Sequence, residues 1–245
     1  MKIEHLVYKG IYKLTLLIFM ASTSMSILAY SSINTKTSVN TKTSVERENI
    51  EAQNNLGSLY EYGQGVPQSY NEAFKLYQGA AEKGLASAQY NLAELYYDGL
   101  GVNQDYTKAL NWYQKAADQG MVEAQFIVGL MYHPGRGVAQ DYNKALEWYL
   151  RASDQEYSRA QNNIGDMYEN GVGVSQNYER AFEWYFKSAN QKQDNSLSQN
   201  SLGIMYEEGR GVRRDLSKAK EWFNKACSNG IESSCADYDR LTKYN

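Results

Sequence analysis

The stretch Gly99-Leu100-Gly101-Val102 is one of five copies of a Gly-x-Gly-Val pattern in a chain of 245 residues. The first glycine of each copy recurs at intervals of 36, 36, 36 and 38 residues, at Gly63, Gly99, Gly135, Gly171 and Gly209. One such pattern alone would be weak evidence for a phosphate-binding loop. Five copies at a nearly fixed period instead indicate a repeat array, in which each unit buries its apolar face against its neighbours.

Each copy lies between two segments whose apolar residues have helical spacing. In the second unit the apolar residues at 88, 92, 95 and 96 predict a first helix, called helix A in every unit. The two glycines end this helix, because glycine adopts a positive φ at little cost. A second helix, helix B, then starts after a residue type that caps helices, three positions beyond the valine. The five capping residues are Ser69, Asp105, Asp141, Asn177 and Asp215.

Helix B carries two large side chains at fixed positions. The first position holds Leu76, Trp112, Trp148, Trp184 and Trp222, and the second holds Tyr77, Tyr113, Tyr149, Tyr185 and Phe223. An aromatic column at one position of a helical repeat is typical of a core, because short helices need large buried rings to be stable. A stacking surface for bases or sugars is the weaker alternative.

The whole unit resembles the Sel1-like repeat, a relative of the tetratricopeptide repeat. The resemblance rests on A-x-x-x-L-G-x-x-Y, then G-x-G-V, then D-Y-x-K-A-x-x-W-Y-x-K-A-A, and it covers about residues 50–245. In helix A it is carried by Ala52, Leu56, Gly57, Tyr60; Ala124, Val128, Gly129, Tyr132; and Ala160, Ile164, Gly165, Tyr168. The resemblance implies an all-α fold: a right-handed α-α superhelical solenoid of about five helix-turn-helix repeats, with a C-terminal capping helix over Glu232–Tyr244.

Three departures from the pattern stand out. Ala93 replaces the glycine of helix A in the second unit. The pair His133-Pro134 should shorten helix A in the third unit, since a proline disfavours helical structure at the residue before it. Two extra residues within Gln191–Ser198 lengthen the connection before the fifth unit. We expect the last two irregular places to distinguish this protein from its relatives.

The N-terminal region has the pattern of an export signal. Residues 1–29 combine three lysines with a short apolar run and end at Ala29, which favours a cleaved signal peptide over an uncleaved anchor. Residues 30–47 contain the tandem sequence NTKTSV and are expected to form a flexible linker before a repeat domain at 48–245. The net charge is −3, so a nucleic-acid partner is not expected. The predicted location is the periplasm or the outside of a bacterial cell.

The two cysteines, Cys227 and Cys235, flank the tight turn before the capping helix. In an exported chain they are expected to form a disulfide, and two free thiols or a metal site are the alternatives. Their spacing also resembles that of the cysteine-rich Sel1-like branch, some members of which are described as penicillin-binding or β-lactamase-like. Ser217 and Lys220 have the S-x-x-K spacing of serine enzymes of that kind, but they match ordinary repeat positions and no K-T-G follows.

No constellation for catalysis, metal or cofactor binding is predicted, because the chain after residue 29 holds one histidine, His133. In helical repeats of this kind helix A lines the concave side. Its exposed face carries asparagines that could bond a peptide backbone, with an apolar patch in the third unit that could hold an anchor side chain. The candidate partner-binding residues are Asn55, Asn91, Glu94, Phe126, Ile127, Leu130, Asn163 and Asp166. The alternative is that Ile127 and Leu130 only pack against neighbouring units.

The sequence therefore favours an exported, non-enzymatic repeat scaffold that binds a protein or peptide through the helix-A face. A penicillin-binding or β-lactamase-like protein and a structural spacer of the cell envelope are the alternatives. No membrane contact is expected beyond an N-terminal anchor.

Overall fold

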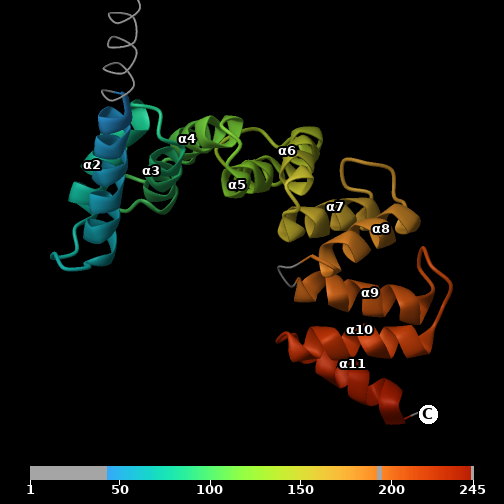
Figure 1. Cartoon of the computed structure of the whole chain (residues 1–245). Helices are drawn as coiled ribbons and strands as arrows, with labels where there is room; N and C mark the ends of the chain where they lie inside the picture. Colours follow the sequence, from blue (N-terminus) through green and yellow to red (C-terminus); the bar gives the residue numbers. More distant parts are fainter. Residues whose placement is uncertain (1–42, 192–194, 244–245) are drawn as a thin grey trace, which may run out of the picture. The chain divides into compact units, whose positions relative to one another are not determined.

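The computed structural model describes residues 43–191 and 195–243, and all regular secondary structure in these residues is helical. A first helix spans residues 43–62. Ten further helices follow (Figure 1): α2 (Tyr70–Glu82), α3 (Ala86–Asp98), α4 (Tyr106–Asp118), α5 (Val122–Tyr132), α6 (Tyr142–Asp154), α7 (Ser158–Asn170), α8 (Tyr178–Ala189), α9 (Ser196–Glu208), α10 (Leu216–Ser228) and α11 (Glu232–Lys243). The all-α repeat fold expected from the sequence is confirmed.

The chain divides into two units, one that ends at Ala52 and one that begins at Gln53. The repeats described below belong to the second unit. The first helix starts at residue 43, five residues before the boundary expected at Glu48. The predicted signal peptide and residues 30–42 of the predicted linker lie outside the described residues. No described helix combines the length and the apolar character that a bilayer-spanning segment requires.

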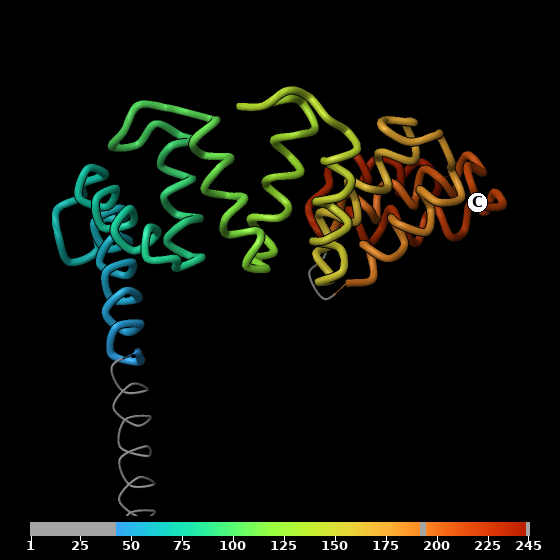
Figure 2. The backbone as a smooth tube through the Cα atoms, turned by 90° about the horizontal axis from the view of Figure 1, so that it is seen from above, coloured from blue at the N-terminus to red at the C-terminus, as the bar shows by residue number. Residues whose placement is uncertain are grey.

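Helices of the second unit pack chiefly against the helices next to them in sequence. Each of α2 to α10 packs against its successor, and Figure 2 shows them following one another in chain order. Odd-numbered helices are helix A of a repeat, and even-numbered helices are helix B. Such nearest-neighbour packing is typical of a solenoid, whose stability depends on the joints between consecutive elements.

The helix boundaries follow from the capping residues. At all five helix-B starts the predicted cap accepts a hydrogen bond from the backbone N–H three residues later, as Asp105 does from Lys108 at 2.9 Å. Gly99 ends α3 with a left-handed backbone, as predicted. α5 has 11 residues where α3 has 13, so Pro134 shortens it as expected.

The second glycine of the Gly-x-Gly-Val pattern does more than form the turn. Gly137 has a φ of +74°, and a Cβ atom there would lie 2.5 Å from the backbone carbonyl of Tyr106 in the preceding repeat. Gly65, in the first of the five matching positions, has a φ of +77° and nothing within 4 Å of such a Cβ. The second glycine is therefore a point of close approach between repeats, whereas the sequence predicted only a turn.

The aromatic column of helix B is the centre of the core, as predicted. Tyr77, Tyr149, Tyr185 and Phe223 are completely buried, and Tyr113 is 1% exposed. The tryptophan column differs from the prediction, since Trp112 and Trp184 are only half-buried. Each tryptophan lies under a cation three residues later, as with Lys115 Nζ, 3.6 Å from the ring centroid of Trp112. Cation–π contact and the lysine or arginine stem thus cover the outer edge of the core.

A series of glutamine side chains joins successive repeats, and the sequence analysis did not predict it. Gln89 donates from its Nε2 to the carbonyl oxygen of Ala81, eight residues earlier, at 3.2 Å. Its Oε1 accepts from Gln119, at the end of helix B in its own repeat, at 2.8 Å. Gln125 repeats both contacts, with Ala117 and Gln155. Each of these buried glutamines therefore connects helix B of the preceding repeat to helix B of its own repeat.

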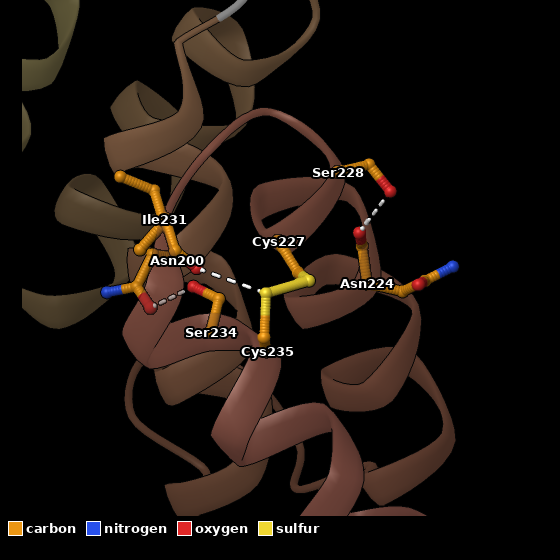
Figure 3. Close-up of a disulfide and its surroundings, with 7 residues drawn as sticks. All are labelled: Asn200, Asn224, Cys227, Ser228, Ile231, Ser234 and Cys235. Atoms are coloured by element: carbon orange, nitrogen blue, oxygen red, sulfur yellow. Dashed lines mark hydrogen bonds between the residues drawn. A yellow bond between two sulfur atoms is a disulfide. The ribbon is translucent and has the colours of Figure 1, made fainter.

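The disulfide occupies the position of this glutamine contact in the last repeat. Cys227 and Cys235 are eight residues apart, as Ala81 and Gln89 are, and their sulfur atoms are bonded with the Cα atoms 4.7 Å apart (Figure 3). Beside them, Ser234 donates to Asn200 Oδ1 at 2.7 Å. A covalent bond thus attaches α11, the predicted capping helix, where the internal repeats use a hydrogen bond.

Candidate functional site

The helix-A face of the third and fourth repeats contains two neighbouring pockets. The first, the Tyr157 pocket, has a volume of about 760 Å³ and is lined by Glu123, Phe126, Tyr157, Ser158, Arg159, Asn162, Asn163, Asn195, Ser196 and Leu197. The second, the Tyr149 pocket, has a volume of about 450 Å³ and is lined by Tyr97, Leu130, His133, Pro134, Arg136, Tyr149, Asn163 and Asp166. Asn163 of α7 lines both.

Four of the candidate binding residues line these pockets. Phe126 and Asn163 line the Tyr157 pocket, and Leu130, Asn163 and Asp166 line the Tyr149 pocket. Phe126 is 8% exposed, and its ring centroid lies 5.2 Å from that of Tyr157. Leu130 is 37% exposed. The structure therefore brings together the candidates from α5 and α7.

The other four candidates do not line either pocket. Asn55 is exposed, and Asn91 donates to Asn54 Oδ1 at 3.1 Å. Ile127 is half-buried and packs against the core. Glu94 accepts a hydrogen bond from the Tyr113 hydroxyl. Glu94 therefore satisfies a buried hydroxyl of its own repeat.

A carboxylate satisfies the buried tyrosine hydroxyl in three repeats. Tyr77 Oη donates to Glu61 at 2.5 Å, and Tyr113 Oη donates to Glu94. Tyr185 Oη has a single proton, which Asp166 and Glu169 share as acceptors at 2.7 and 2.6 Å. Burial, together with these carboxylates, raises the pKa of all three hydroxyls far above the usual value for tyrosine. The tyrosines therefore stay protonated and act as hydrogen-bond donors.

Tyr149 of the third repeat lacks this partner. Leu130 occupies the repeat position of Glu94 and Asp166, and His133 occupies that of Glu61 and Glu169. Among the described residues, no acceptor takes the proton of the Tyr149 hydroxyl, whose oxygen is buried, and the Asn163 amide acts on that oxygen only as a donor. Burial raises the pKa of Tyr149 to about 12, an effect that the nearby Asn163 amide opposes. The Tyr149 pocket thus contains a hydrogen-bond donor that no protein acceptor uses.

Arg136 and Asp166, which carry opposite charges and both line the Tyr149 pocket, differ in the partners that they have inside the protein. The Arg136 guanidinium donates to the Tyr97 hydroxyl and lies over the rings of Tyr97 and Tyr106, at 5.5 and 5.4 Å. No carboxylate of the described residues forms an ion pair with Arg136. Asp166, in contrast, accepts from Tyr185 and also from Asn162 Nδ2 at 3.0 Å. The pocket therefore holds an unpaired cation beside an acid that is already satisfied.

Comparison with known proteins identifies the repeats. The sequence matches the Sel1 repeat at residues 50–85, 86–121, 122–157, 158–192 and 196–231. The chain belongs to the Sel1 repeat family. A comparison with curated protein sequences found no match.

Solved structures of Sel1 repeat proteins share the fold. One is c5321, described as a protective antigen of uropathogenic Escherichia coli with an SLR fold, which is 36% identical with a TM-score of 0.76. That match covers 80% of this chain but only 42% of c5321. A Sel1 repeat protein from Oxalobacter formigenes is 34% identical over 77% of this chain and 76% of its own, with a TM-score of 0.73. PilF of Pseudomonas aeruginosa shares the fold alone, at 21% identity over 81% of this chain and 85% of its own, with a TM-score of 0.57.

Sel1 repeat proteins are generally scaffolds without enzymatic activity that bind other proteins. In this Sel1 repeat chain, Ser217 is an exposed residue at the start of α10. Lys220 Nζ, the other half of the S-x-x-K spacing, lies over the ring of Tyr238 at 5.5 Å. The ring of His133 packs edge-on against that of Tyr142, with the centroids 5.1 Å apart. None of these contacts places a nucleophilic side chain next to a base.

Sequence reasoning missed several residues of the two pockets. Tyr149 was assigned to the core only, and Arg136 and Tyr97 were not singled out. A comparison of Leu130 with Glu94 could have pointed to them, because it shows that the third repeat has no carboxylate at this position of helix A. Each irregular place of the Sel1 pattern also contributes to one pocket: His133-Pro134 to the Tyr149 pocket, and Asn195–Leu197 to the Tyr157 pocket.

Proposed function

We propose that this chain is an exported, non-enzymatic scaffold that binds another protein or peptide through the helix-A face of its third and fourth repeats. The observation that carries the proposal is the pair of pockets joined at Asn163. Among the described residues, this part of helix A combines hollowed surface with both apolar and hydrogen-bonding side chains. Such a combination suits an extended peptide, whose backbone and side chains need different partners.

The two pockets divide these tasks. Asn163 of α7 offers its amide group to a peptide backbone, while Phe126 offers an aromatic surface in the Tyr157 pocket. Leu130 offers apolar surface in the Tyr149 pocket. In peptide interfaces an anchor side chain in a pocket supplies much of the affinity, and hydrogen bonds from an amide to the backbone fix the direction of the peptide.

Export is the second part of the proposal. It is supported by the signal-like pattern of residues 1–29, by the disulfide and by the bacterial origin of the similar Sel1 proteins. Disulfides persist in oxidising compartments such as the periplasm. In this scheme residues 30–47 connect the signal to a repeat domain at 48–245, although the first five helical residues of that domain precede residue 48.

The test compares two leucines of similar exposure on opposite helices of the third repeat. Leu130 of helix A is 37% exposed, and Leu150 of helix B is 38% exposed. The purified chain is immobilised and used to capture proteins from the cells that produce it, with bound proteins identified by mass spectrometry. We expect Leu130→Asp to lose the captured partner and Leu150→Asp to keep it. Equal capture by both variants would place the interface elsewhere, and no capture by wild type would favour the structural spacer.

A further inference from the structure

We infer that the Tyr149 pocket binds the carboxylate of an aspartate or glutamate side chain that a peptide partner supplies. The inference rests on the proposed function and makes it more specific, since it names the chemical group that is recognised. Three features of the described residues support it: an unused donor, an internal precedent and an unpaired cation.

The unused donor is the Tyr149 hydroxyl. Tyr149 is completely buried, and its hydroxyl proton has no acceptor among the described residues. The residue nevertheless lines a pocket of about 450 Å³. A buried polar group without a partner lowers the stability of the folded state. An acceptor that enters the pocket would recover this free energy on binding.

The internal precedent shows which acceptor fits. Wherever else helix B carries this tyrosine, a carboxylate of helix A accepts its hydrogen bond, as Glu94 does from Tyr113. The fifth repeat carries Ile204 instead of the acid and, with it, Phe223 instead of the tyrosine. Only the third repeat keeps the hydroxyl with no acid at either helix-A position, because Leu130 and His133 stand there. A carboxylate from a partner would therefore complete an arrangement that the other repeats complete internally.

The unpaired cation favours a charged acceptor over a neutral one. Arg136 lines the same pocket and has no carboxylate partner among the described residues. His133 lies on the same wall and offers a further donor. Asp166 is the one acid in the lining, and Tyr185 and Asn162 already hold its two oxygens. A guanidinium and a hydroxyl that converge on one carboxylate give charge-assisted hydrogen bonds.

The experiment is a selection of random displayed peptides on the full chain, followed by affinity measurements. We expect selected peptides to be enriched in Asp or Glu at one position on wild type but not on Tyr149→Phe or Arg136→Gln. For one selected peptide, replacing that Glu by Gln should weaken binding at least tenfold. In Tyr149→Phe the same replacement should change the affinity less than threefold.

Tyr113→Phe is the matched control. It removes the same hydroxyl from the neighbouring repeat, where Glu94 holds it internally, so peptide selection should match wild type. Peptides that bind equally well with Glu or Gln, yet are lost in Leu130→Asp, would overturn this inference and leave the proposed function intact. Failure to select any peptide that depends on Leu130 would overturn both.

Discussion

The second and third repeats share one backbone plan but treat the same tyrosine differently. Both have a cap that begins helix B, a pair of glycines before it and a fully buried tyrosine ring. In the second repeat Glu94 accepts from that tyrosine, whereas in the third repeat the position holds Leu130 and a pocket. Positions common to the repeats therefore support the fold, and the differences between them provide the surface for binding.

The difference has a cost that the fold does not require. A phenylalanine at position 149 would fill the same space without an unsatisfied hydroxyl, as Phe223 does in the fifth repeat. The other repeats either give this buried hydroxyl an acceptor or replace the tyrosine by phenylalanine. A repeat that does neither points to function, since selection for folding alone would favour one of these two solutions. Four predictions test this comparison between the repeats.

The largest effect is expected where the two repeats touch. Gly137→Ala should lower the free energy of unfolding by about 3 kcal/mol, because it combines a left-handed backbone with a clash against Tyr106. Gly65→Ala has the same backbone strain but no clash, so this variant should lower the free energy of unfolding by about 1–2 kcal/mol. Urea unfolding measures both values. Equal losses would show that the glycine matters only for the turn.

The second effect contrasts the two tyrosines. Tyr113→Phe removes a hydrogen bond to the Glu94 carboxylate and should lower the free energy of unfolding by about 2 kcal/mol. Tyr149→Phe removes an unused hydroxyl and should leave stability unchanged or slightly higher. Thermal unfolding of the two variants checks the contrast. A large loss in Tyr149→Phe would mean that the hydroxyl has a partner in solution.

The third prediction concerns a variant that gives the third repeat the acid found in the second. Leu130→Glu places an acid where Glu94 stands, so the Tyr149 hydroxyl gains an acceptor from its own repeat. Affinity for an acidic peptide should fall at least tenfold, which corresponds to about 1.4 kcal/mol, and stability should change by about 0.5 kcal/mol or less. Leu150→Glu adds the same charge on helix B and should keep the affinity. Unchanged binding by Leu130→Glu would contradict the role of the missing acid.

The smallest effect concerns pH. Burial raises the pKa of Asp166, an effect that the Tyr185 hydroxyl opposes. The folded protein then holds this proton more tightly than the unfolded chain does. The resulting stability is present below the unfolded pKa of about 4 and is lost as pH rises through the folded value. Asp166→Asn should therefore gain stability relative to wild type between pH 4 and 7, by less than about 1 kcal/mol.

The control for the pH effect is Asp154→Asn, which removes one exposed carboxylate from the neighbouring helix. Its stability relative to wild type should be nearly constant over the same range. Denaturant unfolding at several pH values measures both variants. A constant difference for Asp166→Asn as well would show that burial does not perturb this acid.

Much of the fold was predictable because it depends on local patterns. The caps, the shortened α5 and the buried tyrosine column follow from the residues within one unit. The contact of Gly137 with Tyr106 and the glutamine series could not be predicted, because they depend on how consecutive units approach each other in space.

The candidate site was predictable only in part, for the same reason. The apolar character of Leu130 and the polar character of Asn163 were visible in the sequence. That Glu94 meets Tyr113, and that Leu130 therefore leaves Tyr149 unpaired, requires the distance between two helices. The predicted signal peptide and residues 30–42 of the predicted linker lie outside the described residues and stay predictions.

The disulfide also bears on how many units such an array can have. Gln89 and Gln125 each donate to helix B of the preceding repeat and accept from the end of helix B in their own repeat, so a duplicated unit inserted between them would meet matching contacts on both sides. Cys235 occupies the same position in α11, but its sulfur is bonded to Cys227 and offers no amide acceptor to a helix B. Copy number is therefore free to change in the interior, while the joint at α11 closes the series.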